Sequence, residues 1–478
     1  MKFYFSKFNI SLLFVCSLCY LTTNALASND EEAKKTIIGI WKTTLEEKGT
    51  ELILILDFQA TESDSLACTL HVPEMGGNMP FGKFILNGDK LTLPGFEAAL
   101  DVENQKITGT FSAFGPEMKL TLEKISKIPE FNNESPIKEI DWAFKSDGAI
   151  WSSPTISKGR IIFGNDEGNL YSVKIDDKSV AWKIKCSAAI RSKAIIIDGN
   201  ICFTSDDGYL YLVDFETGKS KWKVNIGNDM SPRIKLAKDD HTYDYICSSA
   251  SVSEGRIFIG SMDSCIYAIN ANNGDVLWKH KTGGRIRSTP LVNEGAVYVG
   301  SWDHFMYSFK ASNGELIWKY DAGRSIQSSP IAIDNKLIFG SRASSVFALD
   351  IASGEELWKT SFWGSWVESS PVLYGGNVYV GSSDYRKICA INPDNGMVIM
   401  STRLEGWAWP TPAVSDKYIY SGCIGTLYYT ENMHGSFYAF DRLTGKAVWQ
   451  VKAEDDPNTF AYGFASSPTL WDGWVFFG

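Results

Sequence analysis

A repeat of about forty residues is the feature that most constrains the fold of this chain. Trp182 and Trp222 are 40 residues apart, as are Trp278 and Trp318. Each copy holds four short apolar segments, which alone would expose sheet edges and one apolar face to water. A repeat of four strands at this period predicts a β-propeller. A glycine four positions before the Trp slot, where Met400 once replaces Trp, recurs as Gly218, Gly274, Gly314, Gly354, Gly396 and Gly445.

The repeat count predicts an all-β fold with eight blades over residues 139–478. Inner strands are expected to begin near Ser152, Ser192, Ser248, Ser288, Ser328, Ser369, Pro410 and Ser466. Outer strands are expected at Trp142, Trp182, Trp222, Trp278, Trp318, Trp358, Met400 and Trp449. Because Trp142 precedes the first inner strand, Glu139–Lys145 is predicted to close the last blade as its outer strand. No third strand follows Trp474–Gly478, so we expect either a truncated sequence or an incomplete blade, and favour truncation because backbone groups would otherwise stay unpaired.

Residues 36–125 carry a different pattern, with about eight short strands that predict a small antiparallel β-barrel or sandwich. Asn87-Gly88 predicts a two-residue hairpin turn between Lys83–Leu86 and Asp89–Leu93. The segment resembles the lipocalin-like domain that precedes catalytic domains in some secreted bacterial hydrolases, on Gly39, Trp41, this hairpin and Ile107–Phe111. The resemblance implies no chemistry, and Trp41 is predicted to lie in the core rather than in a ligand platform. A polar linker with two prolines is expected over 126–138.

The N-terminus predicts export. Lys2 and Lys7 precede the apolar run Ile10–Leu21, and Ala25-Leu26-Ala27 offers a cleavage site, so residues 1–27 are predicted to be a secretory signal peptide. A membrane anchor is the alternative, and a lipoprotein is disfavoured because Val15 and Leu18 precede the two leader cysteines. We expect a periplasmic, outer-membrane-associated or extracellular protein without a transmembrane span in the mature chain.

Composition and scarce motifs limit the possible chemistry. The formal net charge of -10 argues against nucleic acid as a partner. The seven cysteines after the leader are predicted to be buried hydrophobes, and no disulfide is assigned. None of the five histidines lies in a zinc motif or a nucleophile elbow, so no metal site and no catalytic residue is predicted. Recurring acids after the second strand of a blade, at Asp166, Asp206, Asp263, Asp303 and Asp384, are predicted to be structural.

Repeats of the form Val297–Gly300, Met306–Phe309 and Gly314–Trp318 resemble the tryptophan-docking repeats of the pyrroloquinoline quinone (PQQ) family of propellers. The resemblance covers residues 139–478. That family includes quinone-dependent dehydrogenases and cofactor-free members, among them a bacterial lipoprotein that scaffolds the assembly of outer-membrane barrels. The adjacent cysteine pair and the large insertions of the dehydrogenases are missing here. We therefore expect no cofactor, with PQQ and calcium as the alternative.

Loops on one face of a propeller surround its central funnel, and here they are rich in Trp and Arg. Aromatic faces beside guanidinium groups suit the binding of planar groups, anions or sugars. The sequence therefore predicts an exported, monomeric, non-catalytic scaffold or recognition propeller that binds an envelope or extracellular protein or a small ligand. The alternative is a PQQ- and calcium-dependent alcohol or sugar dehydrogenase. The predicted binding residues are Trp151, Arg191, Arg287, Trp302, Arg324, Trp363, Trp366, Glu368, Trp407 and Trp409.

Overall fold

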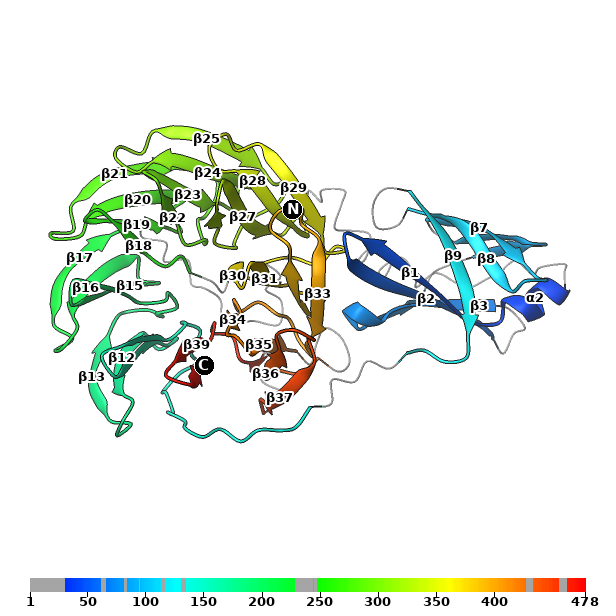
Figure 1. The fold of residues 1–478 in the computed structure, drawn as a ribbon, viewed down its shortest axis with the longest axis horizontal. Coiled ribbons are helices and arrows are strands. Elements are labelled where there is room, and N and C mark those ends of the chain that lie inside the picture. The colour runs from blue at the N-terminus through cyan, green and yellow to red at the C-terminus, as the bar shows by residue number, and fades with distance from the viewer. Residues whose placement is uncertain are drawn as a thin grey trace, which may run out of the picture. The chain divides into compact units, whose positions relative to one another are not determined.

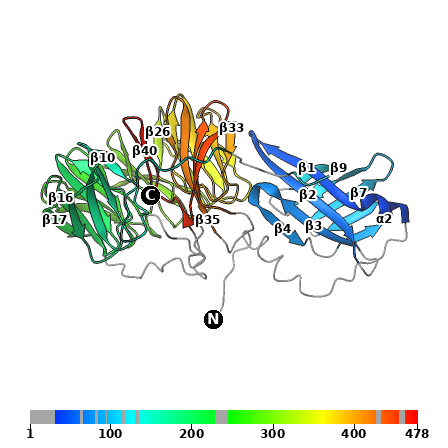
Figure 2. The same cartoon turned by 90° about the horizontal axis from the view of Figure 1, so that it is seen from below.

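The computed structural model forms two compact units, residues 1–132 and 133–478, whose boundary lies inside the expected linker. Figures 1 and 2 show the two units, each of which is considered by itself. The structure describes residues 31–61, 66–80, 84–93, 95–112, 117–129, 135–227, 244, 247–426, 433–454 and 462–478. The predicted signal peptide, residues 1–27, lies outside these residues. None of the helices formed by the described residues has the length and apolar character needed to cross a membrane.

The first unit is a curled antiparallel sheet of nine strands, in the order β4-β3-β2-β1-β9-β8-β7-β6-β5. No pairing joins the edge strands β4 and β5 among the described residues, so the predicted barrel is not closed by backbone hydrogen bonds. The elements are α2 (Glu31–Ile37), β1 (Gly39–Glu47), β2 (Thr50–Ala60), β3 (Leu66–Val72), η1 (Pro73–Met75), β4 (Gly77–Pro80), β5 (Ile85–Asn87), β6 (Lys90–Leu93), β7 (Phe96–Asp101), β8 (Lys106–Phe111) and β9 (Met118–Ile125).

Two local details of this unit differ from the sequence expectation. Asn87 pairs with Lys90, so the hairpin turn is Gly88-Asp89, one residue later than predicted. Gly88 has a φ of 59°, the conformation that glycine adopts at least cost. Helix α2 was not predicted; it is joined to the sheet by the indole Nε1 of Trp41, which donates to the Ile37 carbonyl at 2.7 Å. Trp41 is fully buried, which confirms its predicted place in the core.

The second unit is a propeller with seven four-stranded antiparallel blades that follow one another around a ring (Figure 1). The first three blades are β10 (Thr155–Ser157), β11 (Arg160–Gly164), β12 (Asn169–Lys174) and β13 (Val180–Lys185); β14 (Ile195–Ile197), β15 (Asn200–Ser205), β16 (Tyr209–Asp214) and β17 (Ser220–Asn225); and β18 (Ser251–Ser253), β19 (Arg256–Gly260), β20 (Cys265–Asn270) and β21 (Val276–Lys281). The fourth and fifth are β22 (Leu291–Asn293), β23 (Ala296–Gly300), β24 (Phe305–Lys310) and β25 (Leu316–Asp321); and β26 (Ile331–Ile333), β27 (Lys336–Ser341), β28 (Ser345–Asp350) and β29 (Glu356–Ser361). The sixth and seventh are β30 (Val372–Tyr374), β31 (Asn377–Gly381), β32 (Lys387–Ile391) and β33 (Val398–Arg403); and β34 (Ala413–Val414), β35 (Tyr418–Gly425), β36 (Ser436–Asp441) and β37 (Ala447–Lys452), with β38 (Tyr462–Gly463) paired to β35.

The recurring Trp and Gly lock each blade to the next. Trp318 Nε1 donates to the Ile351 carbonyl, at the end of the third strand of the following blade, at 3.2 Å. Gly354 of that blade lies against the Trp318 ring, and a Cβ at this position would be only 2.6 Å from the ring. The same contact joins Gly218 to Trp182 and Gly314 to Trp278. The glycines are therefore required by the close approach of two blades.

The eighth position in the ring holds a two-stranded hairpin, β39 (Thr469–Trp471) and β40 (Trp474–Phe476). It meets the first blade through a hydrogen bond from Ser467 N to Ser153 Oγ of 3.1 Å. The all-β propeller is thus confirmed, whereas eight complete blades are not. The predicted outer strand Glu139–Lys145 was wrong, because these residues form no strand. Instead Ile137, just before this segment, makes a parallel bridge to Gln450 on the edge of β37.

The cysteines of the described residues carry no disulfide, and six of the seven are buried. Cys202, Cys389 and Cys423 are essentially inaccessible inside the sheets. Burial raises the pKa of the Cys389 thiol to about 12, which keeps it neutral and unreactive. The six buried cysteines therefore have the role of small core residues that the sequence predicted.

Candidate functional site

The fold brings all ten predicted binding residues to one end of the propeller. Because the strands of each blade are antiparallel, loops from second to third strands emerge at the same end as loops that lead into the next blade. We call this end the funnel face. Trp302 lies in a loop of the first kind, between β23 and β24. The loops that lead into the next blade's first strand hold Trp151, Arg191, Arg287, Arg324, Trp363, Trp366, Glu368, Trp407 and Trp409.

On the funnel face one arginine, Arg342, contacts two tryptophan rings and a carboxylate. The guanidinium carbon of Arg342 lies 4.7 Å from the centroid of the Trp302 ring and 4.4 Å from that of Trp366. Its Nε donates to Glu368 Oε1 at 2.5 Å. The side chains of Arg342 and Glu368 are 10% and 1% exposed, so this ion pair is shielded from solvent. Burial raises the pKa of the Glu368 carboxyl, and the Arg342 charge opposes that rise.

A second ion-pair group extends the first around the funnel. The Asp244 carboxylate accepts hydrogen bonds from Arg287 and, at 2.9 Å, from Arg285. Arg285 also lies 6.0 Å from the Trp302 ring centroid, on the tryptophan that stacks with Arg342. Arg287 is 1% exposed, so it holds Asp244 in place rather than presenting its charge to a ligand. Trp302 is therefore in contact with two guanidinium groups, each of which is held by a carboxylate.

Arg191, between β13 and β14, forms a similar bridge between the first two blades. It donates through Nε to Asp166 at 2.8 Å and through Nη1 to Asp206 at 3.0 Å. Cys247 Sγ lies 3.2 Å from the other oxygen of Asp206. The guanidinium therefore joins the first and second blades, and the Cys247 thiol, in the loop before β18, adds a contact from the third.

Trp407 and Trp409 do not form an accessible platform, although the sequence suggested one. Their rings stack on each other with centroids 4.8 Å apart and an interplanar angle of 4°. They are 2% and 5% exposed and pack with Ile424 in a buried cluster, with Trp151 against its edge. Their indole nitrogens donate to Asp384 and Ser383. The two rings therefore form a small buried core among the loops. The Trp-Ala-Trp spacing in the sequence could not show whether these side chains are buried or exposed.

Trp363 adopts a conformation that is rare for a large side chain. Its φ is 53°, and Gly364 follows with a φ of 85°. Its indole Nε1 is buried and has no hydrogen-bond partner within the described part of the chain. Backbone strain of this kind costs on the order of 1–3 kcal/mol and is common at binding sites. The Trp363 side chain packs against a buried cluster that includes Phe362, Val367 and Tyr385.

One repeat position supplies much of this layer, namely the residue just before each inner-strand serine or proline. In chain order it is Trp151, Arg191, Cys247, Arg287, Gln327, Glu368, Trp409 and Ala465. Sequence reasoning missed Gln327, which is 2% exposed. Neither polar atom of its carboxamide has a hydrogen-bond partner among the described residues. Aligning the copies on this position would have identified it. Arg324 is half-buried and enters no ion pair of the described residues, so its charge remains available on this face.

Two of the recurring acids after the second strands, Asp263 and Asp303, hold turns together. Asp303 accepts hydrogen bonds from Tyr307 Oη at 2.7 Å and from the Gly283 amide at 2.6 Å. Asp263 accepts one from Tyr267 in the same way. No group of three His, Cys, Asp or Glu residues in the described ranges could hold a metal ion. His304, in the same turn as Asp303, is exposed.

We expect Asp303→Ala to lower the free energy of unfolding by about 1–3 kcal/mol, because the Tyr307 hydroxyl and a backbone amide lose their acceptor. Urea unfolding measures the loss. Tyr307→Phe should cost less, about 0.5–1.5 kcal/mol, because it removes one hydrogen bond and leaves the amide paired. Equal losses for the two variants would contradict the role assigned to the carboxylate.

A ring of four-stranded sheets docked by recurring Trp residues, with a packed loop layer, is the architecture of a repeat propeller. A family model described as "Outer membrane protein assembly factor BamB" matches residues 138–234, 244–366 and 342–476. The chain belongs to this family, which confirms the resemblance seen in its repeats. A search of curated protein sequences gives no match.

Two solved structures resemble this chain in fold. BamB from Moraxella catarrhalis has 16% sequence identity and a TM-score of 0.51, over 69% of this chain and 92% of that one. The computationally designed Ika8 protein has 15% identity and a TM-score of 0.56, over 70% and 94% of the two chains. At these identities the likeness concerns the fold alone.

Proposed function

We propose that this protein is an exported, non-catalytic scaffold that binds a protein partner of the cell envelope through its funnel face, in the assembly of outer-membrane proteins. Membership of a family named for outer-membrane protein assembly supports this role. A periplasmic or outer-membrane-associated location is part of the proposal, and it rests on the predicted signal peptide.

The arrangement around Arg342 carries the proposal. A guanidinium stacked between Trp302 and Trp366 and paired with Glu368 is already neutralised, so it is a rigid support rather than a reactive group. Rigid aromatic and arginine side chains are the residue types that dominate protein interfaces. Arg324 supplies an unpaired charge beside this rigid group, within the described residues.

A PQQ- and calcium-dependent dehydrogenase remains the second candidate function, proposed on the repeat family alone. Such an enzyme needs a carboxylate base near the quinone and oxygen ligands for calcium. The acids of the funnel face here accept hydrogen bonds from arginines or from an indole, as Asp244, Glu368 and Asp384 do. Adding PQQ and calcium to the purified protein tests this candidate: quinone binding and reduction of an electron acceptor by an alcohol would favour the enzyme.

The scaffold role is tested by replacing the gene, in the organism that carries it, with an Arg324→Glu variant. Charge reversal should weaken binding about tenfold or more, because like charges now face the partner surface. Outer-membrane barrel proteins should then fall toward the level of the deletion strain at an unchanged amount of the variant. Lys446→Glu is the matched control, since Lys446 is exposed in a turn between β36 and β37, at the opposite end of the propeller. Normal barrel-protein levels in both the Arg324→Glu and the deletion strain would contradict the proposal.

A further inference from the structure

A ring of hydrogen bonds runs around the central channel of the propeller, just inside the funnel-face loops. The first strands of the blades surround this channel, since those of neighbouring blades contact one another, as β18 contacts β22 and β22 contacts β26. The ring is formed by the residue that follows each inner-strand serine or proline. Its amide donates to the hydroxyl of its counterpart in the next blade, as Ser249 N does to Thr289 Oγ1 at 3.1 Å. The donors in chain order are Lys193, Ser249, Thr289, Ser329, Ser370, Thr411 and Ser467.

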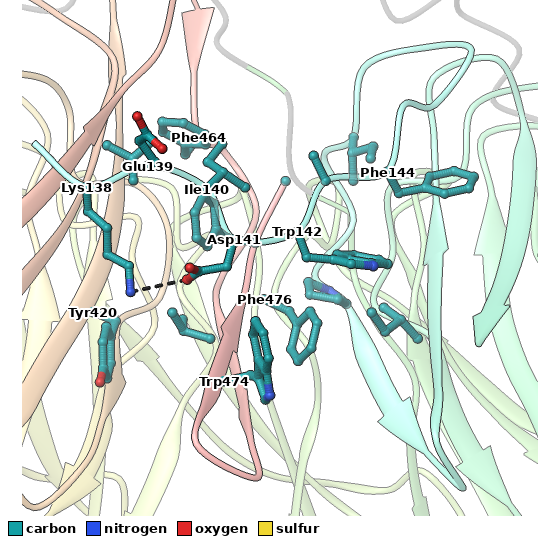
Figure 3. A pocket seen from close by; sticks show the side chains of 18 of the residues that line it. Lys138, Glu139, Ile140, Asp141, Trp142, Phe144, Tyr420, Phe464, Trp474 and Phe476 are labelled. Atoms are coloured by element: carbon teal, nitrogen blue, oxygen red, sulfur yellow. Dashed lines mark ion pairs between the residues drawn. The ribbon is translucent and has the colours of Figure 1, made fainter. Parts of the chain in front are cut away.

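The ring continues through the hairpin at the eighth position. Ser467 N donates to Ser153 Oγ at 3.1 Å and so links the hairpin to the first blade. The pocket shown in Figure 3, where the hairpin residues Trp474 and Phe476 lie near Trp142, is next to this link, because Pro154 lines it. Neither Ser153 nor Lys193 lines that pocket. Seven of the eight steps around the channel are therefore closed by a hydrogen bond.

The open step lies between the first and second blades. The side chain at this step belongs to Lys193, whereas the other seven ring residues are Ser or Thr, and a lysine ammonium cannot accept a hydrogen bond. The Ser153 amide, which should donate here, makes no hydrogen bond among the described residues. Thr155 Oγ1 donates to the Ala194 carbonyl at 2.5 Å and joins the two first strands beside the gap. Because the other ring side chains point toward the amide of the preceding blade, Lys193 begins beside the Ser153 amide, and both groups are donors without an acceptor.

Lys193 also lacks a negative partner. The residues two places along each first strand lie on the same side of the strand as the ring residues. All are uncharged, namely Thr155, Ile195, Ser251, Leu291, Ile331, Val372, Ala413 and Thr469. The acids of the adjoining loops, Asp166 and Asp206, both accept hydrogen bonds from Arg191. Lys193 is exposed to solvent, yet burial lowers the pKa of its ammonium, so the amine lies in an enclosed space that water can enter. A cation in such a space is stabilised by an anion.

We propose that the gap between Ser153 and Lys193 is a binding site for a small oxyanion, either phosphate or a carboxylate, at the base of the funnel. One oxygen of the anion accepts from the Ser153 amide, in the place that a Ser or Thr hydroxyl takes in the rest of the ring. Another oxygen pairs with the Lys193 ammonium. The site lies between the first two blades, apart from the stack of Trp302, Arg342 and Trp366, and goes beyond the proposed function.

Amide hydrogen exchange on the purified chain, in a buffer free of phosphate and carboxylates, tests the site. Without an added anion, Ser153 should exchange about tenfold faster or more than Thr289, whose amide is hydrogen-bonded at the same ring position. For a Kd of about 1 mM, phosphate or acetate at about ten times that concentration should slow Ser153 about tenfold and leave Thr289 unchanged. Slowing by either anion supports the site, and the more effective anion identifies the ligand. No slowing by either would overturn the proposal.

Lys193→Ser is the most informative variant, because it gives the open step the residue type found in the rest of the ring. It should slow exchange at Ser153 without any anion and abolish the effect of phosphate, since the new hydroxyl accepts from the amide. The added hydrogen bond should raise the thermal unfolding midpoint by about 1–3 °C, so loss of phosphate binding would not reflect misfolding. Lys193→Met, which has neither charge nor acceptor, should lose the phosphate effect while Ser153 exchange stays fast.

Lys446→Ser is the matched control. It removes the same charge from an exposed turn at the opposite end of the propeller and should leave phosphate binding unchanged. Loss of phosphate protection in both Lys193 variants but not in this control supports the site. Protection of Ser153 by phosphate that survives Lys193→Met, or that Lys446→Ser weakens equally, would overturn it.

Discussion

Replacing Arg342 by alanine is expected to lower the free energy of unfolding by about 3–5 kcal/mol, the range seen when one partner of a buried ion pair is removed. The variant leaves Glu368, with 1% of its side chain exposed, without the cation that faces it. It also removes the cation–π contacts with Trp302 and Trp366. Urea unfolding at pH 7 measures the loss.

Two further variants separate the causes of this loss. Glu368→Gln added to Arg342→Ala should recover at least about 1 kcal/mol, because an amide costs less to bury than a carboxylate. Arg342→Lys should lose less than alanine, since it keeps the charge but not the flat stacking surface. A loss for Arg342→Ala below about 1 kcal/mol would contradict the assigned role.

The loss should also depend on pH. The pKa of Glu368 in the folded protein is raised by burial, and removing Arg342 raises it further because the opposing charge is gone. A folded-state pKa above the unfolded value means that the folded protein binds the proton more tightly, so stability falls as pH rises through that interval. The deficit of Arg342→Ala should therefore be smaller near about pH 5 than at pH 7. A deficit that does not change with pH would argue against a buried carboxylate as its cause.

The second large effect is expected for Gly354→Ala, which should destabilise the protein by about 2–4 kcal/mol through backbone strain and a steric clash. The new Cβ would lie 2.6 Å from the Trp318 ring, at a φ of 76°. Gly295→Ala is a matched control, because Gly295 has a φ of 78° but no atom within 4 Å of the new Cβ. The control should cost about 1 kcal/mol, and the difference measures the blade-docking contact. Equal losses would show that the contact with Trp318 contributes nothing.

The sequence predicted the propeller because its docking contact is local and repeated. The contact between Trp318 and Gly354 recurs between Trp182 and Gly218 and between Trp278 and Gly314, so the periodicity of these residues revealed it. Helix α2 was missed because its stability comes from Trp41 and from burial of Ile37 against the sheet, which no local pattern records. The segment 139–145 was wrongly predicted as a strand because its apolar pattern matches the repeat while its pairing partner is absent among the described residues.

For the candidate site, the sequence identified the right face but not the accessibility of its residues. All ten predicted residues lie in funnel-face loops, because loop position follows from strand order. Arg287 and Trp409 were expected to bind a ligand but are buried, at 1% and 5% exposed. Arg287 pairs with Asp244, and Trp409 packs in a cluster with Trp407. Such contacts join residues distant in sequence, so a repeat pattern cannot show them. Arg342, at the centre of the site, was recognisable only as one of several arginines on that face.

The most direct test of the scaffold role is site-specific photo-crosslinking in the organism that carries the protein. A photoreactive amino acid is placed at Arg324, on the funnel face, and for comparison at Lys446, at the other end of the propeller. The proposal predicts a crosslink to one component of the outer-membrane protein assembly machinery from position 324 and none from position 446. Crosslinks to that component from position 446 alone, or from neither position, would contradict binding through the funnel face.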